Sequence, residues 1–148
     1  MDEPFRFRFR VRYGECDAQG IVFNARWGDY IDIAATEFTR AVFGGVDLET
    51  VGIDWRLVRQ LIEWRAPARF DDVVEAAVTT AAIGTTSFTL ATRFSRLAGG
   101  LALAAAETVY VVVAPGSGDK QPVPDRHRAA LVGAARGVLV DHAGSRSR

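Results

Sequence analysis

The stretch RYGECDAQGIVFNARWGDYIDIAATEF, from Arg12 to Phe38, decides the fold because the spacing of its apolar residues changes along it. From Phe5 to Tyr13, apolar residues alternate with arginines, the period that places every apolar side chain on one face of a β-strand. After Asn24 the apolar residues recur every three or four positions, as they do in an amphipathic helix. The stretch and the residues before it therefore predict a strand that ends near Tyr13, a short connection and a long helix that begins near Asn24.

The long helix is predicted from Asn24 to Phe43 and ends at Gly44-Gly45, since glycine is the residue that most often follows a helix. Its apolar face is broad and aromatic, which favours a helix wrapped by a sheet over a helix lying on a surface. The positions on this face are Trp27, Tyr30, Ile31, Ala34, Ala35, Phe38, Ala41 and Val42.

Four β-rich stretches follow the helix, separated by residues that favour tight chain reversal. Their succession indicates neighbouring antiparallel strands. The stretches are residues 57–66, 73–83, 87–95 and 101–113. One strand, one long helix and four further strands predict an α+β fold in which a curved five-stranded antiparallel sheet wraps a long central helix.

The C-terminal part contains a Gly-, Ser- and Pro-rich loop at residues 115–124 and a short C-terminal helix predicted over residues 125–136. The last residues, GSRSR, have the composition of a frayed terminus. We therefore expect a single domain over residues 1–138 and a disordered tail over residues 139–148.

The 148 residues carry 18 basic and 18 acidic side chains, so the net charge gives no long-range attraction to nucleic acid or to an anionic membrane. Cys16 is the only cysteine, which excludes an intramolecular disulfide and a multi-cysteine zinc site. No secretory signal pattern precedes the first strand, and no apolar run reaches the roughly 18 residues of a membrane span. We expect a cytoplasmic protein with no metal, no nucleic-acid partner and no membrane partner.

The stretch quoted above resembles the signature segment of the 4-hydroxybenzoyl-CoA thioesterase family, which has the hot-dog fold. The matching positions are Tyr13, Asp17, Gly20, Ile21, Val22, Phe23 and Trp27. The resemblance implies hydrolysis of an acyl-CoA thioester to a carboxylic acid and coenzyme A, with Asp17 as the catalytic carboxylate. It also implies that no cofactor is needed, because coenzyme A is part of the substrate, and that a homodimer or homotetramer forms with the active site at the shared interface.

Thioester hydrolysis needs a group that attacks the carbonyl or activates water, and donors that hold the negative charge on the carbonyl oxygen. Asp17 is suited to the first task as nucleophile or as general base, and the sequence leaves both open. The backbone N–H groups of Gly20 and Asn24 are suited to the second, because they lie near the N-terminus of the predicted helix. A turn-forming role for Asp17 is the alternative, since Asp is common in tight turns.

An acyl pocket should have apolar walls, for which Phe23, Trp27 and Trp64 are the candidates. Coenzyme A carries several phosphates, and arginines bind phosphate well. The candidate arginines are Arg59, Arg65, Arg69 and Arg93.

Two further carboxylates compete with Asp17 for the catalytic role. Asp32 and Glu37 lie on the predicted helix, where a second branch of hot-dog thioesterases places its catalytic acid. An ion pair of Glu37 with Arg40 is the simpler role for that residue, because side chains three residues apart on a helix are neighbours. The sequence therefore favours Asp17.

Cys16 is a second candidate nucleophile, but a catalytic cysteine normally needs a histidine partner. The only histidines, His127 and His142, are near the C-terminus. We expect Cys16 to be buried and inert, and the same shortage of histidine argues against a Ser-His-Asp hydrolase and a zinc site.

Two other functions stay open beside the hydrolase. A hot-dog dehydratase uses a histidine near the start of the helix, where this chain has Phe23-Asn24. A non-catalytic acyl-thioester binding protein would keep the pocket and would not need Asp17. The presence of Asp17 together with Gly20 favours the hydrolase.

Overall fold

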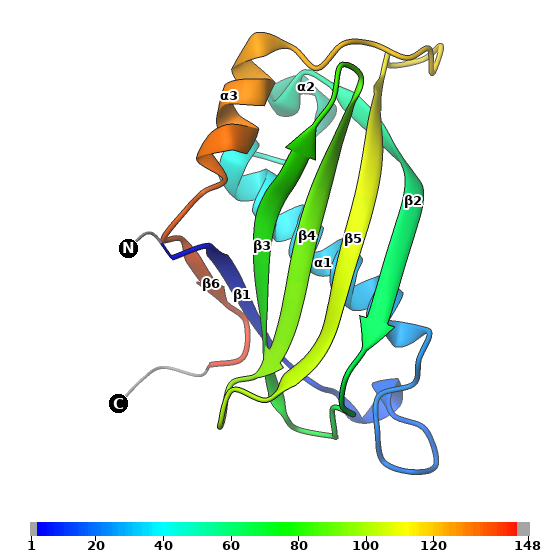
Figure 1. Cartoon of the computed structure of the whole chain (residues 1–148), viewed down its shortest axis with the longest axis vertical. Helices are drawn as coiled ribbons and strands as arrows, with labels where there is room; N and C mark the ends of the chain where they lie inside the picture. The colour runs from blue at the N-terminus through cyan, green and yellow to red at the C-terminus, as the bar shows by residue number, and fades with distance from the viewer. Residues whose placement is uncertain (1–2, 145–148) are drawn as a thin grey trace.

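The computed structural model describes residues 3–144, which form an α+β structure with six strands in one sheet (Figure 1). The strand order is β2-β5-β4-β3-β1-β6, and neighbours are antiparallel except for the parallel pair β1 and β6. The strands are β1 (Phe5–Arg10), β2 (Asp54–Trp64), β3 (Val73–Ile83), β4 (Ser87–Arg96), β5 (Ala102–Val113) and β6 (Leu139–Asp141). The helices are α1 (Arg26–Phe43), α2 (Leu48–Val51) and α3 (Asp125–Gly133), with a 3-10 turn η1 (Tyr13–Glu15) before α1.

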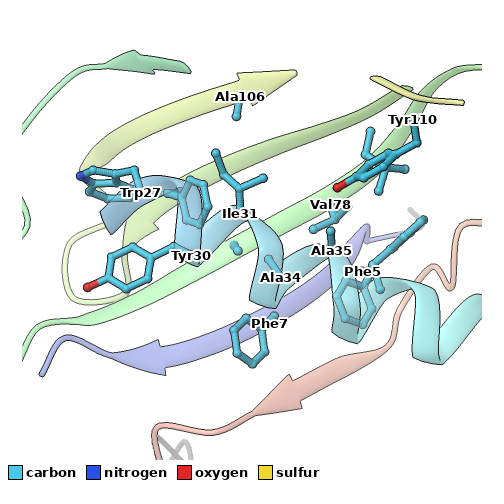
Figure 2. Close-up of a cluster of buried hydrophobic side chains, with 14 of the residues drawn as sticks. Phe5, Phe7, Trp27, Tyr30, Ile31, Ala34, Ala35, Val78, Ala106 and Tyr110 are labelled. Carbon is cyan, nitrogen blue, oxygen red and sulfur yellow. The ribbon is translucent and has the colours of Figure 1, made fainter. Parts of the chain in front are cut away.

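Helix α1 buries one side against the sheet, and this contact forms the core. The rings of Phe38 and Phe5 meet edge to face with centroids 5.7 Å apart, and Trp27 packs on Phe94 of β4 at 5.2 Å. Figure 2 shows α1 side chains together with those of β1, β3 and β5 in this cluster. The buried residues of α1 are Trp27, Tyr30, Ile31, Ala34, Ala35, Phe38 and Thr39.

Helix α1 begins at Arg26, two residues later than predicted, because a tight turn precedes it. In that turn the Arg26 N–H donates to the Phe23 carbonyl at 2.9 Å. The helix ends at Phe43 as predicted, and Gly44 follows with φ of +77°, a left-handed conformation that glycine adopts without strain.

The other predicted elements are present with small shifts in their bounds. Strand β3 has its predicted bounds, and β2 begins at residue 54 instead of 57. Helix α3 ends at Gly133 instead of residue 136, because Ala134 and Ala135 adopt φ of +54° and +44°. No helix within residues 3–144 combines the length and hydropathy that a membrane span requires.

Two predictions about the end of the chain are wrong. The sheet has six strands instead of five, because Leu139–Asp141 pair with β1. Residues 139–144 therefore carry a strand and do not belong to a disordered tail, while residues 145–148 lie outside the described part of the chain. The pairing is held by the His142 N–H, which donates to Arg8 O at 2.9 Å, and by the rings of His142 and Phe7, whose centroids are 4.9 Å apart.

Removing β6 tests its contribution to stability. A chain ending at Val138 loses the pairing with β1 and the ring contact of His142, so we expect its free energy of unfolding to fall by about 1–3 kcal/mol in urea denaturation. A chain ending at Gly144 keeps β6 and is the matched control. Equal stability of the two chains would contradict a structural role for β6.

Candidate active site

Asp17 lies in a tight loop between η1 and α1. Its N–H donates to the Ile21 carbonyl at 2.8 Å, and its own carbonyl accepts the Gly20 N–H at 2.9 Å. Oδ1 of the half-buried Asp17 side chain accepts the Gln19 N–H at 2.8 Å, whereas Oδ2 has no partner among the described residues. Asp17 therefore supports the turn with one carboxylate oxygen, and the other oxygen has no partner within residues 3–144.

Some backbone N–H groups of this loop donate a hydrogen bond within the loop, and others have no acceptor among the described residues. The Gly20 N–H is committed to the turn, and Gly20 supplies its φ of +78°, which a residue with a Cβ rarely adopts. The N–H groups of Asn24 and Ala25 donate to no group within residues 3–144. Both precede α1, where unpaired amides and the helix dipole favour negative charge. The available donors are thus Asn24 and Ala25, and Gly20 shapes the turn.

The loop is held in place on both sides by backbone hydrogen bonds. The Val22 N–H donates to Ala68 O at 2.8 Å, and the Phe23 N–H donates to Glu15 O at 3.0 Å. Cys16 and Val22 also form a β-bridge across the base of the loop. The position of Asp17 is therefore fixed by the chain on either side of it.

Glu15 links the loop to α1 through its side chain. Oε1 accepts the Arg12 backbone N–H at 2.8 Å and the Tyr30 hydroxyl at 2.9 Å, and Oε2 accepts the Arg12 guanidinium at 2.8–2.9 Å. Burial opposes ionisation of this carboxyl, but these hydrogen bonds outweigh it and lower the pKa of Glu15. Burial and the bond to Glu15 raise the pKa of Tyr30. The sequence analysis did not identify this pair. Glu15 accepts the backbone N–H of Arg12, three residues earlier, as the Glu of a capping box does, but Arg12 is not the Ser or Thr that reveals a capping box in a sequence.

A pocket of about 260 Å³ opens beside the loop and brings together three of the predicted residues, Asn24, Trp27 and Trp64. Trp27 is anchored in the core and only 2% exposed, whereas Trp64 on β2 is 53% exposed. Phe23 is 52% exposed and does not line the pocket. The remaining wall residues are Ile21, Val22, Arg65, Ala66 and Pro67.

Asp17 and Gly20 are not part of this wall. Ile21, which accepts the Asp17 N–H, and Val22, which pairs with Cys16, both line the pocket. Asp17 is therefore joined to the pocket wall by a single hydrogen bond, and the apolar pocket lies next to the loop that carries Asp17.

Residues 11–131 match the thioesterase-like superfamily. The chain belongs to this family. A protein of Aquifex aeolicus (strain VF5) described as "Putative esterase" is 36% identical over 73 residues, which are 49% of this chain and 57% of that relative. The alignment thus spans little more than half of the relative's length.

Two solved thioesterase structures resemble this chain over most of its length. A gentisyl-coenzyme A thioesterase, BH1999, has 26% identity and a TM-score of 0.73, covering 85% of this chain and 98% of its own. A 1,4-dihydroxy-2-naphthoyl-CoA thioesterase from Synechocystis, Slr0204, has 20% identity and a TM-score of 0.77. The match covers 87% of this chain and 96% of Slr0204. The resemblance to hot-dog thioesterases that the sequence predicted is confirmed.

The rival carboxylates on α1 lie outside the pocket that Trp27 lines. Glu37 pairs with Arg40 at 3.3 Å, the ion pair expected from the sequence. Asp32 is exposed, and burial together with the nearby Asp32 charge raises the pKa of Tyr110 to about 12.

Cys16 is half-buried and has no histidine partner. Burial, followed by the neighbouring carboxylates of Glu15 and Asp17, raises the pKa of its thiol, so the protonated and less reactive form predominates at neutral pH. His127 instead contacts Val51 O at 2.6 Å. The thiol therefore lacks the features of a catalytic cysteine.

The four candidate arginines are separated by the fold. Arg65 lines the pocket, and the backbone of Arg69 forms a bridge with Ile21 in the loop. Arg59 lies on the edge strand β2, and Arg93 lies on β4 and lines a different pocket. Only Arg65 and Arg69 are beside the loop that carries Asp17.

The link between Tyr30 and Glu15 predicts a pH-dependent stability. Tyr30→Phe removes one bond that lowers the Glu15 pKa, and we expect it to cost about 2 kcal/mol at pH 7. A lowered carboxyl pKa stabilises the fold above the unfolded value, near 4.5, and this contribution is lost as the pH falls through the folded pKa. The difference between wild type and Tyr30→Phe should therefore narrow below about pH 4.5.

Urea denaturation from pH 3 to pH 7 measures this difference. Tyr13→Phe is the matched control, because Tyr13 is 82% exposed and its hydroxyl forms no hydrogen bond within the described residues. A difference between wild type and Tyr30→Phe that stays constant over this range would contradict the role assigned to Glu15.

Proposed function

We propose that this chain hydrolyses acyl-CoA thioesters, with Asp17 as the reacting carboxylate. Three features of the loop support this proposal. Asp17 keeps one carboxylate oxygen without a partner, the Asn24 and Ala25 amides have no acceptor among residues 3–144, and an apolar pocket lies next to them. A carboxylate, free amide donors and an apolar pocket are the parts that thioester hydrolysis requires.

Two routes use these parts. In the nucleophilic route, an Asp17 oxygen attacks the carbonyl carbon, the C–S bond breaks, and coenzyme A leaves as a thiolate that takes a proton from water. A second water hydrolyses the resulting anhydride and restores the carboxylate. In the general-base route, Asp17 takes a proton from the water that attacks the carbonyl, the C–S bond then breaks, and the proton passes from Asp17 to the departing coenzyme A thiolate. Both routes need donors for the carbonyl oxygen, the task we assign to the Asn24 and Ala25 amides.

We further propose that the acyl group is aromatic. Trp27 and Trp64 offer indole rings to the pocket, and rings favour edge-to-face or offset stacking with one another. A volume of about 260 Å³ suits a small ring system rather than a long chain. The name of the compared protein at 26% identity specifies a gentisyl group, which is aromatic. Arg65 and Arg69 are the arginines we assign to the coenzyme A phosphates.

We propose that the protein is a homodimer or a larger homo-oligomer formed along β2. This strand ends the sheet, so one of its edges offers unpaired backbone groups to a second strand. Its exposed apolar residues are Leu57, Val58, Leu61 and Trp64. Because Trp64 also lines the pocket, a partner strand along β2 would close the pocket on its open side. The reaction needs no cofactor, and a single cysteine suits an enzyme of the cytoplasm.

Asp17→Asn tests the proposed hydrolysis. Thiol release from hydroxybenzoyl-, phenylacetyl- and medium-chain acyl-CoA should show activity of the wild type on at least one aromatic thioester, with turnover reduced about a hundredfold or more in Asp17→Asn. Asp32→Asn is the matched control and should keep turnover within about twofold. If Asp32→Asn loses activity while Asp17→Asn retains it, the acid lies on α1. If the wild type releases no thiol from any thioester, a binding protein replaces the hydrolase.

Val58→Lys tests the interface along β2. A charge at this position, which is 57% exposed, should shift the protein to monomers by sedimentation at micromolar concentration and should lower turnover. Val46→Lys places the same charge at an exposed apolar residue before α2 and should leave the oligomer intact. An unchanged oligomer in Val58→Lys would rule out the interface along β2.

A further inference from the structure

A second pocket, of about 380 Å³, lies where the end of α3 meets β3 and β4. Figure 1 shows α3 beside β3, away from the loop that precedes α1. No residue lines both this pocket and the pocket of Trp27 and Trp64. The residues that define its chemistry are Thr79, Thr80, Arg93, Val132, Ala134 and Arg136. It is therefore a separate site from the proposed active site.

The backbone around this pocket departs from regular geometry on both sides. Strand β3 has a bulge between Thr80 and Ala82, and bulges re-aim the side chains next to them. On the other side, Ala134 and Ala135 are left-handed with φ of +54° and +44°, a conformation that costs energy for residues with a Cβ. The Thr80 hydroxyl donates to Leu131 O at 2.6 Å and fixes the last turn of α3 to the bulge.

Two arginines of this pocket have no anionic partner in the described part of the chain. Neither Arg93 nor Arg136 forms an ion pair or a side-chain hydrogen bond within residues 3–144, and no carboxylate lines the pocket. Glu107 on β5 lies opposite Ala91, two residues from Arg93, and does not pair with Arg93. Most other arginines in the described part of the chain contact a carboxylate or a carbonyl oxygen, whereas Arg93 and Arg136, like Arg59, Arg65 and Arg69, have guanidinium groups available as donors.

Thr79 and Thr80 add hydroxyl groups to the wall, and its accessible apolar side chains are the exposed Val132 and the half-buried Ile83. Val132 is exposed on α3, so its side chain is accessible to a ligand. A volume of about 380 Å³ equals about a dozen water molecules in the liquid at roughly 30 Å³ each, which is room for a single ring with an anionic group. A guanidinium group forms two parallel hydrogen bonds to the oxygens of a phosphate or carboxylate, and Val132 and Ile83 offer apolar contacts to a ring.

We propose that this pocket binds a small amphipathic anion, in which a phosphate or carboxylate contacts Arg93 and Arg136 and an apolar body packs on Val132. The proposal does not depend on the thioesterase activity, because it uses neither the loop of Asp17 nor the pocket of Trp64. The proposal assigns Arg93 to this pocket, whereas Arg65 and Arg69 are the arginines assigned to coenzyme A.

Isothermal titration calorimetry of the full chain tests the proposal with four probes. Phenyl phosphate and benzoate carry the ring with either anion, benzyl alcohol carries the ring alone, and inorganic phosphate carries the anion alone. We expect saturable binding of phenyl phosphate, benzoate or both, at least about tenfold tighter than benzyl alcohol and inorganic phosphate. Which of the two aromatic anions binds identifies the anionic group.

Variants test whether the anion binds in this pocket. Arg93→Gln and Arg136→Gln should each weaken binding about tenfold, and Val132→Asp should abolish it by adding a negative charge to the wall. Lys120→Gln removes one positive charge outside the pocket and should change the affinity less than about twofold. Trp64→Ala alters only the other pocket, so retained binding in this variant excludes the proposed active site as the binding location.

Three outcomes would overturn the proposal. The first is the absence of saturable binding of both aromatic anions at millimolar concentration. The second is unchanged affinity in Arg93→Gln, Arg136→Gln and Val132→Asp, each with the melting temperature of the wild type. The third is loss of binding in Trp64→Ala alone, which would assign the anion to the proposed active site.

Discussion

Burial of the aromatic side of α1 is the constraint on which the rest of the structure depends. Trp27, Tyr30 and Phe38 present large apolar surfaces that no helix can leave in water, and at about 25 cal/mol per Å² their burial stabilises the fold strongly. Strands β1, β3, β4 and β5 contribute residues to the core that covers this surface. The 11- and 12-residue strands β3 and β5 are correspondingly long.

The same burial positions the candidate active site. Tyr30 is part of the core, and its hydroxyl reaches Glu15, whose backbone carbonyl in turn holds Phe23. Trp27, one helical turn earlier, is both a core residue and a wall of the pocket. The loop that carries Asp17 therefore rests on buried residues of the core, and a preorganised site needs such support.

The elements with a clear period could be predicted from the sequence, and those defined by contacts between distant residues could not. Helix α1 follows from the spacing of its apolar residues, and strand β3 follows from a β-rich stretch between turn-forming residues. Strand β6 has three residues and pairs in parallel with a strand at the other end of the chain, so no local pattern reveals it. The commitment of the Gly20 amide to its own turn, and the availability of the Asn24 amide, depend on hydrogen bonds that only the folded loop defines.

Glu15 and Asp17 illustrate why residue type alone does not assign a role in this loop. The two carboxylates are two positions apart, but donors occupy both oxygens of Glu15, whereas only one oxygen of Asp17 has a donor. A carboxylate whose oxygens are all engaged is held ionised and rigid, and it has no lone pair placed for a substrate or a water. The number of donors around each carboxylate, set by the fold, therefore makes Glu15 a structural anchor and leaves one oxygen of Asp17 without a partner among residues 3–144.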